Sequence, residues 1–177
     1  MRMFYRLRQL WESLHARPTA PDLALAQVVL APPLMAIFIR LQPSEQAHSL
    51  RILNQLLEQG ENHPDLLAAA LLHDVGKSLY PLQVWERILI VVGKALLPKQ
   101  ARRWGQGQPR GWQRAFVIAE QHPAWGADMA GKAGASPLTV SLIRNHQENP
   151  PSPVHLAGSL QIETLLLHRL QYLDDES

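Results

Sequence analysis

The residues between Ala68 and Lys77 are the ones whose types and order could support chemistry. The segment reads AAALLHDVGK, so an apolar helical run delivers His73 and Asp74 side by side, followed by valine, glycine and lysine. Imidazole nitrogen and carboxylate oxygen together suit a divalent ion such as Mn, Fe, Co, Ni or Zn. Lys77 adds a compact positive charge that can meet an anionic substrate. The segment therefore predicts a metal site with a phosphate group beside it.

Further histidines and acids are needed, because a single His-Asp pair is a weak signal in a chain with eight histidines. Four such residues occur elsewhere in the sequence: His48, His122, His146 and Asp174. In chain order, the candidates read His, His-Asp, His, His, Asp. Each falls within or at the end of a different expected helix, so their side chains could converge in the core of a helical bundle.

This ordered set resembles the HD-domain superfamily of metal-dependent phosphohydrolases, in its HDIG-type branch, from about Ser44 to the C-terminus. The resemblance implies an all-α helical bundle that binds two divalent ions, with Mn, Fe, Co, Ni, Zn and Mg all left open. It implies six metal ligands, namely His48, His73, Asp74, His122, His146 and Asp174. Asp74 would bridge the two ions and Lys77 would lie beside the scissile phosphate, so these two are the implied catalytic residues.

The chain departs from the cyclic-di-GMP-cleaving members of that superfamily at two points. Those relatives carry a double histidine, whereas Gln147 follows His146 here, so one potential ligand is missing. They also carry a Gly-Tyr-Pro signature, and no such tripeptide occurs in this chain. The motifs therefore do not support a cyclic-di-GMP substrate. The last ligand is also open, because Glu163 and Asp175 are alternatives to Asp174.

Length and composition favour one domain with an N-terminal extension. The chain has 177 residues, of which 46% are hydrophobic, and this is enough for one sizeable core. We expect a helical extension over residues 1–43 that packs on an HD-type domain over residues 44–177. The absence of cysteine excludes disulfides and thiolate metal sites, and it fits a reducing compartment such as the cytoplasm.

Apolar residues recur at helical spacing through most of the chain, and no convincing strand pair is present. Ser136-Pro137 is typical of a helix start, because an N-cap residue is followed by proline at the first helical position. Since proline interrupts a helix, we expect Pro123 to open a separate helix. The other expected helices cover residues 44–59, 64–73, from near Pro81 to before Pro98, 111–121, 136–146 and a last segment with Leu160, Leu167, Leu170 and Leu173.

A basic segment lies between two of the candidate ligands. From Glu86 to Glu120 the chain carries seven basic residues and no acidic one in between. We expect this segment, together with Lys77, to bind the non-reacting groups of a phosphorylated small molecule or nucleotide; a solvated helix face is the alternative. The expected substrate-binding arginines are Arg102, Arg103, Arg110 and Arg114. The tryptophans do not form a recognised stacking platform, so we expect no stable nucleic-acid complex.

The stretch from Leu23 to Ile39 contains no charged residue. It is barely long enough to span a bilayer, and Pro32-Pro33 interrupts it. We therefore expect two short helices that pack on the bundle or form a homodimer contact. Peripheral membrane attachment is the alternative.

Three functions fit the predicted site. The leading hypothesis is a bimetallic phosphohydrolase that cleaves a nucleotide-like phosphomonoester or phosphodiester with a metal-activated water. The second is an HD-type mixed-valent di-iron oxygenase, because the resemblance implies the same ligand set for that branch. The third is a non-catalytic module that senses a nucleotide or a metal. The sequence leaves the substrate, the native metal and the oligomeric state open.

Overall fold

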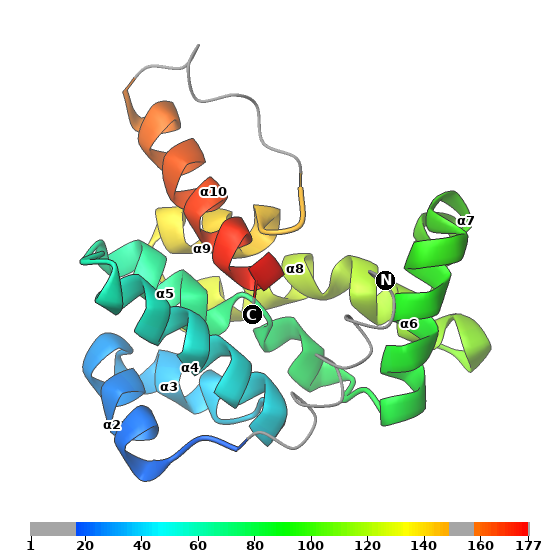
Figure 1. Cartoon of the computed structure of the whole chain (residues 1–177), viewed down its shortest axis with the longest axis horizontal. Coiled ribbons are helices and arrows are strands. Elements are labelled where there is room, and N and C mark those ends of the chain that lie inside the picture. Colours follow the sequence, from blue (N-terminus) through cyan, green and yellow to red (C-terminus); the bar gives the residue numbers. More distant parts are fainter. Residues whose placement is uncertain (1–16, 149–157, 177) are drawn as a thin grey trace.

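The computed structural model describes residues 17–148 and 158–176, and over these ranges it contains helices and no strand. The predicted all-α fold is therefore confirmed. Figure 1 shows α2 to α5 gathered on one side and α6 and α7 on the other, with α8 running between them. The elements are α2 (Ala20–Val29), α3 (Pro32–Phe38), α4 (Pro43–Glu58), α5 (Pro64–Leu72), the 3-10 helix η1 (Val75–Leu79), α6 (Val84–Leu96), α7 (Pro98–Trp104), the 3-10 helix η2 (Gly111–Gln113), α8 (Arg114–Lys132), α9 (Pro137–Asn145) and α10 (Ser159–Glu176).

Polar caps and prolines fix where several helices begin. Thr19 caps α2, because its side chain accepts from the backbone N–H of Asp22 while the Asp22 carboxylate accepts from the backbone N–H of Thr19. Ser136 caps α9 by accepting from the backbone N–H of Thr139, and Pro137 is the first residue of that helix. The helix start predicted at Ser136-Pro137 is confirmed.

Helix α5 lies at the centre of the core. Every residue from Leu66 to Leu72 is buried, and the helix contacts α2, α4, α9 and α10. A helix that is apolar all round can only be stable when other elements cover every face. Because α5 ends directly at His73, the side chain of His73 projects from the most enclosed part of the fold.

Helix η1 packs against α8 at backbone distance. A Cβ atom built on Gly76 would lie 2.1 Å from the carbonyl oxygen of His122 and 2.7 Å from the backbone nitrogen of Gly126, so only glycine fits at position 76. A Cβ on Gly126 would in turn lie 3.1 Å from the backbone nitrogen of Gly76. This contact holds the end of α5 against the middle of α8, and it brings Asp74 next to His122.

The prediction that Pro123 opens a separate helix is wrong, because α8 runs through Pro123 without a break. An internal proline removes one N–H donor and costs about 3 kcal/mol. Residues on both sides of it are buried against η1 and α9, and their packing outweighs that cost. His122 consequently lies inside a helix. The helix expected from near Pro81 begins at Val84, and Pro98 opens the short helix α7, which the sequence had not predicted.

The two short helices expected between residues 23 and 39 are present as α2 and α3. Ala26, Leu30 and Phe38 belong to the same hydrophobic core as α5. A boundary at residue 43 between extension and domain stays a prediction, as does a homodimer contact. Among the helices of the described ranges, none is both long and apolar enough to cross a bilayer.

Candidate metal centre

Six predicted ligands come together from different elements of the bundle. Their positions are His48 on α4, His73 directly after α5, Asp74 directly before η1, His122 in α8, His146 directly after α9 and Asp174 on α10. Three of the histidines and Asp74 are buried, whereas His48 and Asp174 are partly exposed. That these side chains bind metal stays a prediction, but the structure brings all six to one place.

The first ligand group joins α4, α5 and α10. The Nε2 atom of His48 lies 2.9 Å from Oδ1 of Asp174, and Nε2 of His73 lies 3.5 Å from the same oxygen. His73 Nε2 is also 3.6 Å from Oδ2 of Asp74. Three ligand atoms, one each from His48, His73 and Asp74, lie within 4.8 Å of one another. A single cation could therefore bind to all three.

The second ligand group joins α8 and the end of α9 to the same carboxylate. Nε2 of His122 lies 3.1 Å from Oδ1 of Asp74, and Nε2 of His146 lies 4.0 Å from that oxygen. The two Nε2 atoms are 3.3 Å apart. Oδ2 of Asp74 therefore faces the first group and Oδ1 faces the second. A carboxylate in this position could bridge two ions.

Backbone hydrogen bonds orient three of the histidines toward the centre. In each, Nδ1 is placed to donate to a carbonyl oxygen of the preceding turn, which leaves Nε2 facing inward as the available donor atom for a metal. The distances are 3.0 Å from His73 to Ala70, 2.9 Å from His122 to Ile118 and 2.7 Å from His146 to Ile143.

The Nε2 atom of His73 is the clearest sign that the group of side chains fits a metal. It is buried, and within the described part of the chain it makes no hydrogen bond of ordinary geometry, because Oδ1 of Asp174 at 3.5 Å and Oδ2 of Asp74 at 3.6 Å are too far away. A buried polar atom without a partner costs free energy, so such an atom calls for a ligand. Imidazole nitrogens and carboxylate oxygens are suitable ligands for Zn, Fe, Mn, Co or Ni. The donor set therefore fits a divalent metal ion.

The charges within the centre are strongly coupled. Burial opposes the ionised form of Asp74, but the positive charges of Lys77 and His73 outweigh it and hold the pKa of the Asp74 carboxyl well below its usual range. Burial likewise opposes the imidazolium form of His73, but Asp74 and Asp174 outweigh it and raise the pKa of His73 to about 9. A metal ion entering the first group must therefore displace a proton from His73.

The histidines of the second group behave in the opposite way. Burial, followed by the positive charge of Lys77, lowers the pKa of His122. Burial, followed by repulsion from His73, lowers the pKa of His146 to about 3. Both imidazoles are therefore neutral at pH 7, which is the form that binds metal.

Lys77 touches the centre directly. Its Nζ lies 2.6 Å from Oδ2 of Asp74, and the lysine is supplied by the turn of η1 that begins after Asp74. Burial opposes the charged form of Lys77, but the carboxylate of Asp74 and, less strongly, that of Glu45 outweigh it and raise the pKa of Lys77. Lys77 is therefore a fixed positive charge at the edge of the ligand set.

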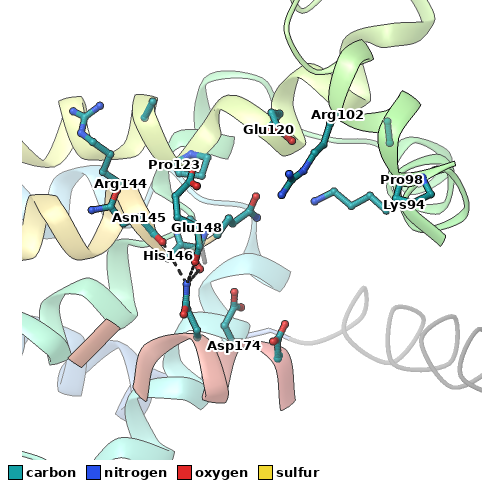
Figure 2. A pocket seen from close by; sticks show the side chains of 15 residues that line it. Lys94, Pro98, Arg102, Glu120, Pro123, Arg144, Asn145, His146, Glu148 and Asp174 are labelled. Atoms are coloured by element: carbon teal, nitrogen blue, oxygen red, sulfur yellow. Dashed lines mark hydrogen bonds between the residues drawn. The ribbon is translucent and has the colours of Figure 1, made fainter. Parts of the chain in front are cut away.

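A cleft of about 730 Å³ opens onto this centre. His146 and Asp174 are among its lining residues, and helices α6 to α10 supply most of its walls (Figure 2). The side chain of Gln171 donates to the carbonyls of His146 and Glu148, so α10 holds the segment that follows α9 in place. The volume is in the usual range for a small-molecule site.

The predicted substrate-binding arginines do not all reach this cleft. Arg102 lines it, whereas Arg103, Arg110 and Arg114 are not among the lining residues. Arg114 instead pairs with the buried carboxylate of Glu86 and donates to the carbonyl of Pro81, 3.2 Å away. Arg114 therefore joins α8 to α6 and to the segment before α6, and it does not face the cleft.

Lys94 also lines the cleft, and the sequence had not singled it out as a site residue. The only available signal was its membership of the basic segment.

Of the three candidates for the last ligand, Asp174 is the one in contact with the histidines. The carboxylate of Glu163 accepts a hydrogen bond from the hydroxyl of Ser141, away from the centre. Asp175 lines the cleft, as does Gln147, which occupies the place of the missing histidine. The geometry favours Asp174 over both alternatives.

Comparison with protein families shows which family the chain belongs to. The family described as the HD domain matches residues 46–175, which is most of the chain and spans all six predicted ligands. The chain belongs to the HD-domain family. Metal-dependent hydrolases are typical of that family, and the buried His and Asp groups could hold a metal ion. No curated protein and no solved structure matched the chain.

Proposed function

We propose that this HD-domain protein is a phosphohydrolase that uses two divalent ions to cleave a nucleotide-like phosphomonoester or phosphodiester. The observation that carries the proposal is the sharing of Asp74 between two ligand groups, of which His146, with the neighbouring Asp174, lines a polar cleft. Lys77 supports a phosphate substrate, because it places a positive charge next to the shared carboxylate.

His48, His73 and Asp174 would hold one ion, His122 and His146 the other, and Asp74 both. Two such ions supply an activated water at neutral pH and neutralise charge on the oxygens of the reacting phosphate. The task of the protein is to fix the donor atoms. The Nδ1 bonds to backbone carbonyls prevent the rings of the buried histidines from turning.

Lys77 would stabilise negative charge on the phosphoryl oxygens. Its ammonium group now neutralises Oδ2 of Asp74 at 2.6 Å. With a cation bound at that carboxylate oxygen, Lys77 would be free to donate to a substrate oxygen instead. Burial of the surrounding side chains strengthens this interaction, because charges attract each other more in a medium of low dielectric constant.

Hydrolysis of aryl phosphate monoesters and diesters tests the proposal. The full-length protein loaded with Mn or Co should release the aryl alcohol without oxygen, and Asp74→Ala should abolish the release. Consumption of oxygen by the Fe-loaded protein without hydrolysis would replace the phosphohydrolase with an oxygenase. Metal binding without either activity would leave a sensing module.

A further inference from the structure

We propose that Lys94 and Arg102 form a second anion-binding subsite across the cleft from the metal ligands, so that the preferred substrate carries a further phosphate beyond the one that reacts. The chemical class would be a polyphosphate ester, such as a nucleoside diphosphate or triphosphate. This inference rests on the proposed phosphohydrolase function and narrows its substrate.

Lys94 and Arg102 reach the cleft from neighbouring helices, α6 and α7. Figure 2 shows both side chains extending from these helices toward the space between them and the segment with His146 and Glu148. The metal ligands His146 and Asp174 line another part of the same cleft. A substrate whose reacting phosphate lies at the ligands could therefore place a second anionic group between the two cations.

Within the described ranges, neither Lys94 nor Arg102 has an acidic group at ion-pair distance. Arg144, the other cation that lines the cleft, is paired with Asp128. Lys77, beside the metal ligands, is paired with Asp74. Lys94 and Arg102 are therefore positive charges that the fold leaves for another partner.

The positive charges around Lys94 act on one another. Although Lys94 is exposed, desolvation by the surrounding chain, followed by repulsion from Lys77, lowers its pKa; Glu120 opposes this effect and Arg102 adds to the repulsion. Like charges gathered in one cleft are unfavourable unless an anion enters between them. A phosphate group between Lys94 and Arg102 would relieve this repulsion, because both cations would attract it.

Close helix packing holds the subsite in place. Gly93 is buried against α8, and a Cβ atom there would lie 2.5 Å from the ring of Phe116. At the end of α7, a Cβ atom on Gly105 would lie 2.6 Å from the Cβ of Glu120. The helices that carry Lys94 and Arg102 therefore have backbone positions fixed against α8, as a preorganised site requires.

The wall of the cleft formed by α10 and the segment after α9 carries negative charge. Glu148 and Asp175 line it, and their carboxylates would repel a phosphate and accept hydrogen bonds from donor groups of a substrate. A phosphate-rich substrate should therefore extend from the metal ligands toward α6 and α7. Its hydroxyl or amino groups would face the segment after α9.

Binding of tripolyphosphate and of inorganic phosphate to the full-length, Mn-loaded protein tests the subsite by calorimetry. The wild-type protein should bind tripolyphosphate at least roughly tenfold more tightly than phosphate, because charge-assisted contacts are strong. The double variant Lys94→Gln with Arg102→Gln should lose this preference and bind inorganic phosphate as before. Lys99→Gln is the matched control, since Lys99 is an exposed cation of α7 that does not line the cleft.

Equal tripolyphosphate affinity in the double variant and the wild-type protein would overturn the subsite. So would an equal loss for both anions, because it would show damage to the metal centre; an unchanged melting temperature and metal content confirm that the variant is folded. This binding readout does not need turnover. If the wild-type protein hydrolyses no phosphate ester but shows the tripolyphosphate preference, the proposed function fails while the subsite stands.

Discussion

Replacing Gly76 with alanine should damage the fold and the metal centre together. The added Cβ would lie 2.1 Å from the carbonyl oxygen of His122, more than an ångström short of the 3.4 Å at which ordinary contact begins. The obstacle is backbone, so no side chain can rotate away. Overpacking of this kind typically costs about 3 kcal/mol at the upper end. For a chain of this size, that corresponds to a melting temperature lower by roughly 6–12 °C.

The metal affinity of Gly76→Ala should fall as well. Relief of the clash requires η1 to move away from α8, and this movement separates Asp74 from His122, now 3.1 Å apart. Metal sites tolerate deviations of only about 0.2 Å in ligand distance. We therefore expect at least one of the two ions to be lost, as measured by elemental analysis of the variant after dialysis.

Gly131→Ala is the matched control for that experiment. Gly131 also lies in α8, but a Cβ there would meet its nearest neighbour, a methyl group of Val140, at an ordinary 3.5 Å. Alanine favours a helix over glycine by about 1 kcal/mol, so the control should be as stable as the wild-type protein or slightly more stable. A Gly76→Ala protein with wild-type melting temperature and metal content would refute the argument from backbone contact.

Two further predictions concern the ligands themselves. His73→Ala or Asp74→Ala should remove most of the bound metal, whereas His168→Ala, at an exposed histidine of α10, should leave it unchanged; equal metal content in all three proteins would show that the ligands are misassigned. The pH dependence should also reflect His73, whose pKa rises from 6.5 to about 9 in the metal-free fold. Because a raised pKa stabilises the fold only while the group is protonated, that contribution is complete below pH 6.5 and lost as the pH rises through about 9. Metal-free protein should therefore lose stability across this window in thermal melts, while Mn affinity increases because the ion no longer competes with a proton. A Mn affinity that is flat between pH 6.5 and 9 would contradict the raised pKa.

That the six candidate ligands lie close together could be predicted from the sequence, from local features and from their order along the chain. The apolar residues before His73 predict a buried helix, and a buried helix can only deliver His73 and Asp74 into the interior. The remaining ligands follow in an order that resembles a known family. The structure adds how Asp74 is oriented: its Oδ2 atom faces His73, and its Oδ1 atom faces His122.

The partners of the basic residues could not be predicted, because they depend on contacts between distant segments. Arg114 pairs with Glu86, 28 residues earlier in the chain. Lys94 lines the cleft because Gly93 lets α6 approach the ring of Phe116, and nothing in the basic segment itself indicates that contact.

The continuous helix through Pro123 has a similar explanation. Local propensity correctly assigns a cost to the proline, but the packing of α8 against η1 and α9 decides the outcome. Such packing is set by residues far away in the sequence, including Gly76 and Gly126. Sequence patterns therefore predict which residues have suitable chemistry better than they predict which of them meet.

Metal content per chain tests the central claim most directly. Elemental analysis would be made on full-length protein purified without chelator and without a metal-affinity tag, before and after incubation with Mn, Co, Fe or Zn. The two ligand groups that share Asp74 predict close to two ions per chain. A chain that binds no metal even after incubation would contradict the account, since the buried histidines would then serve the fold alone.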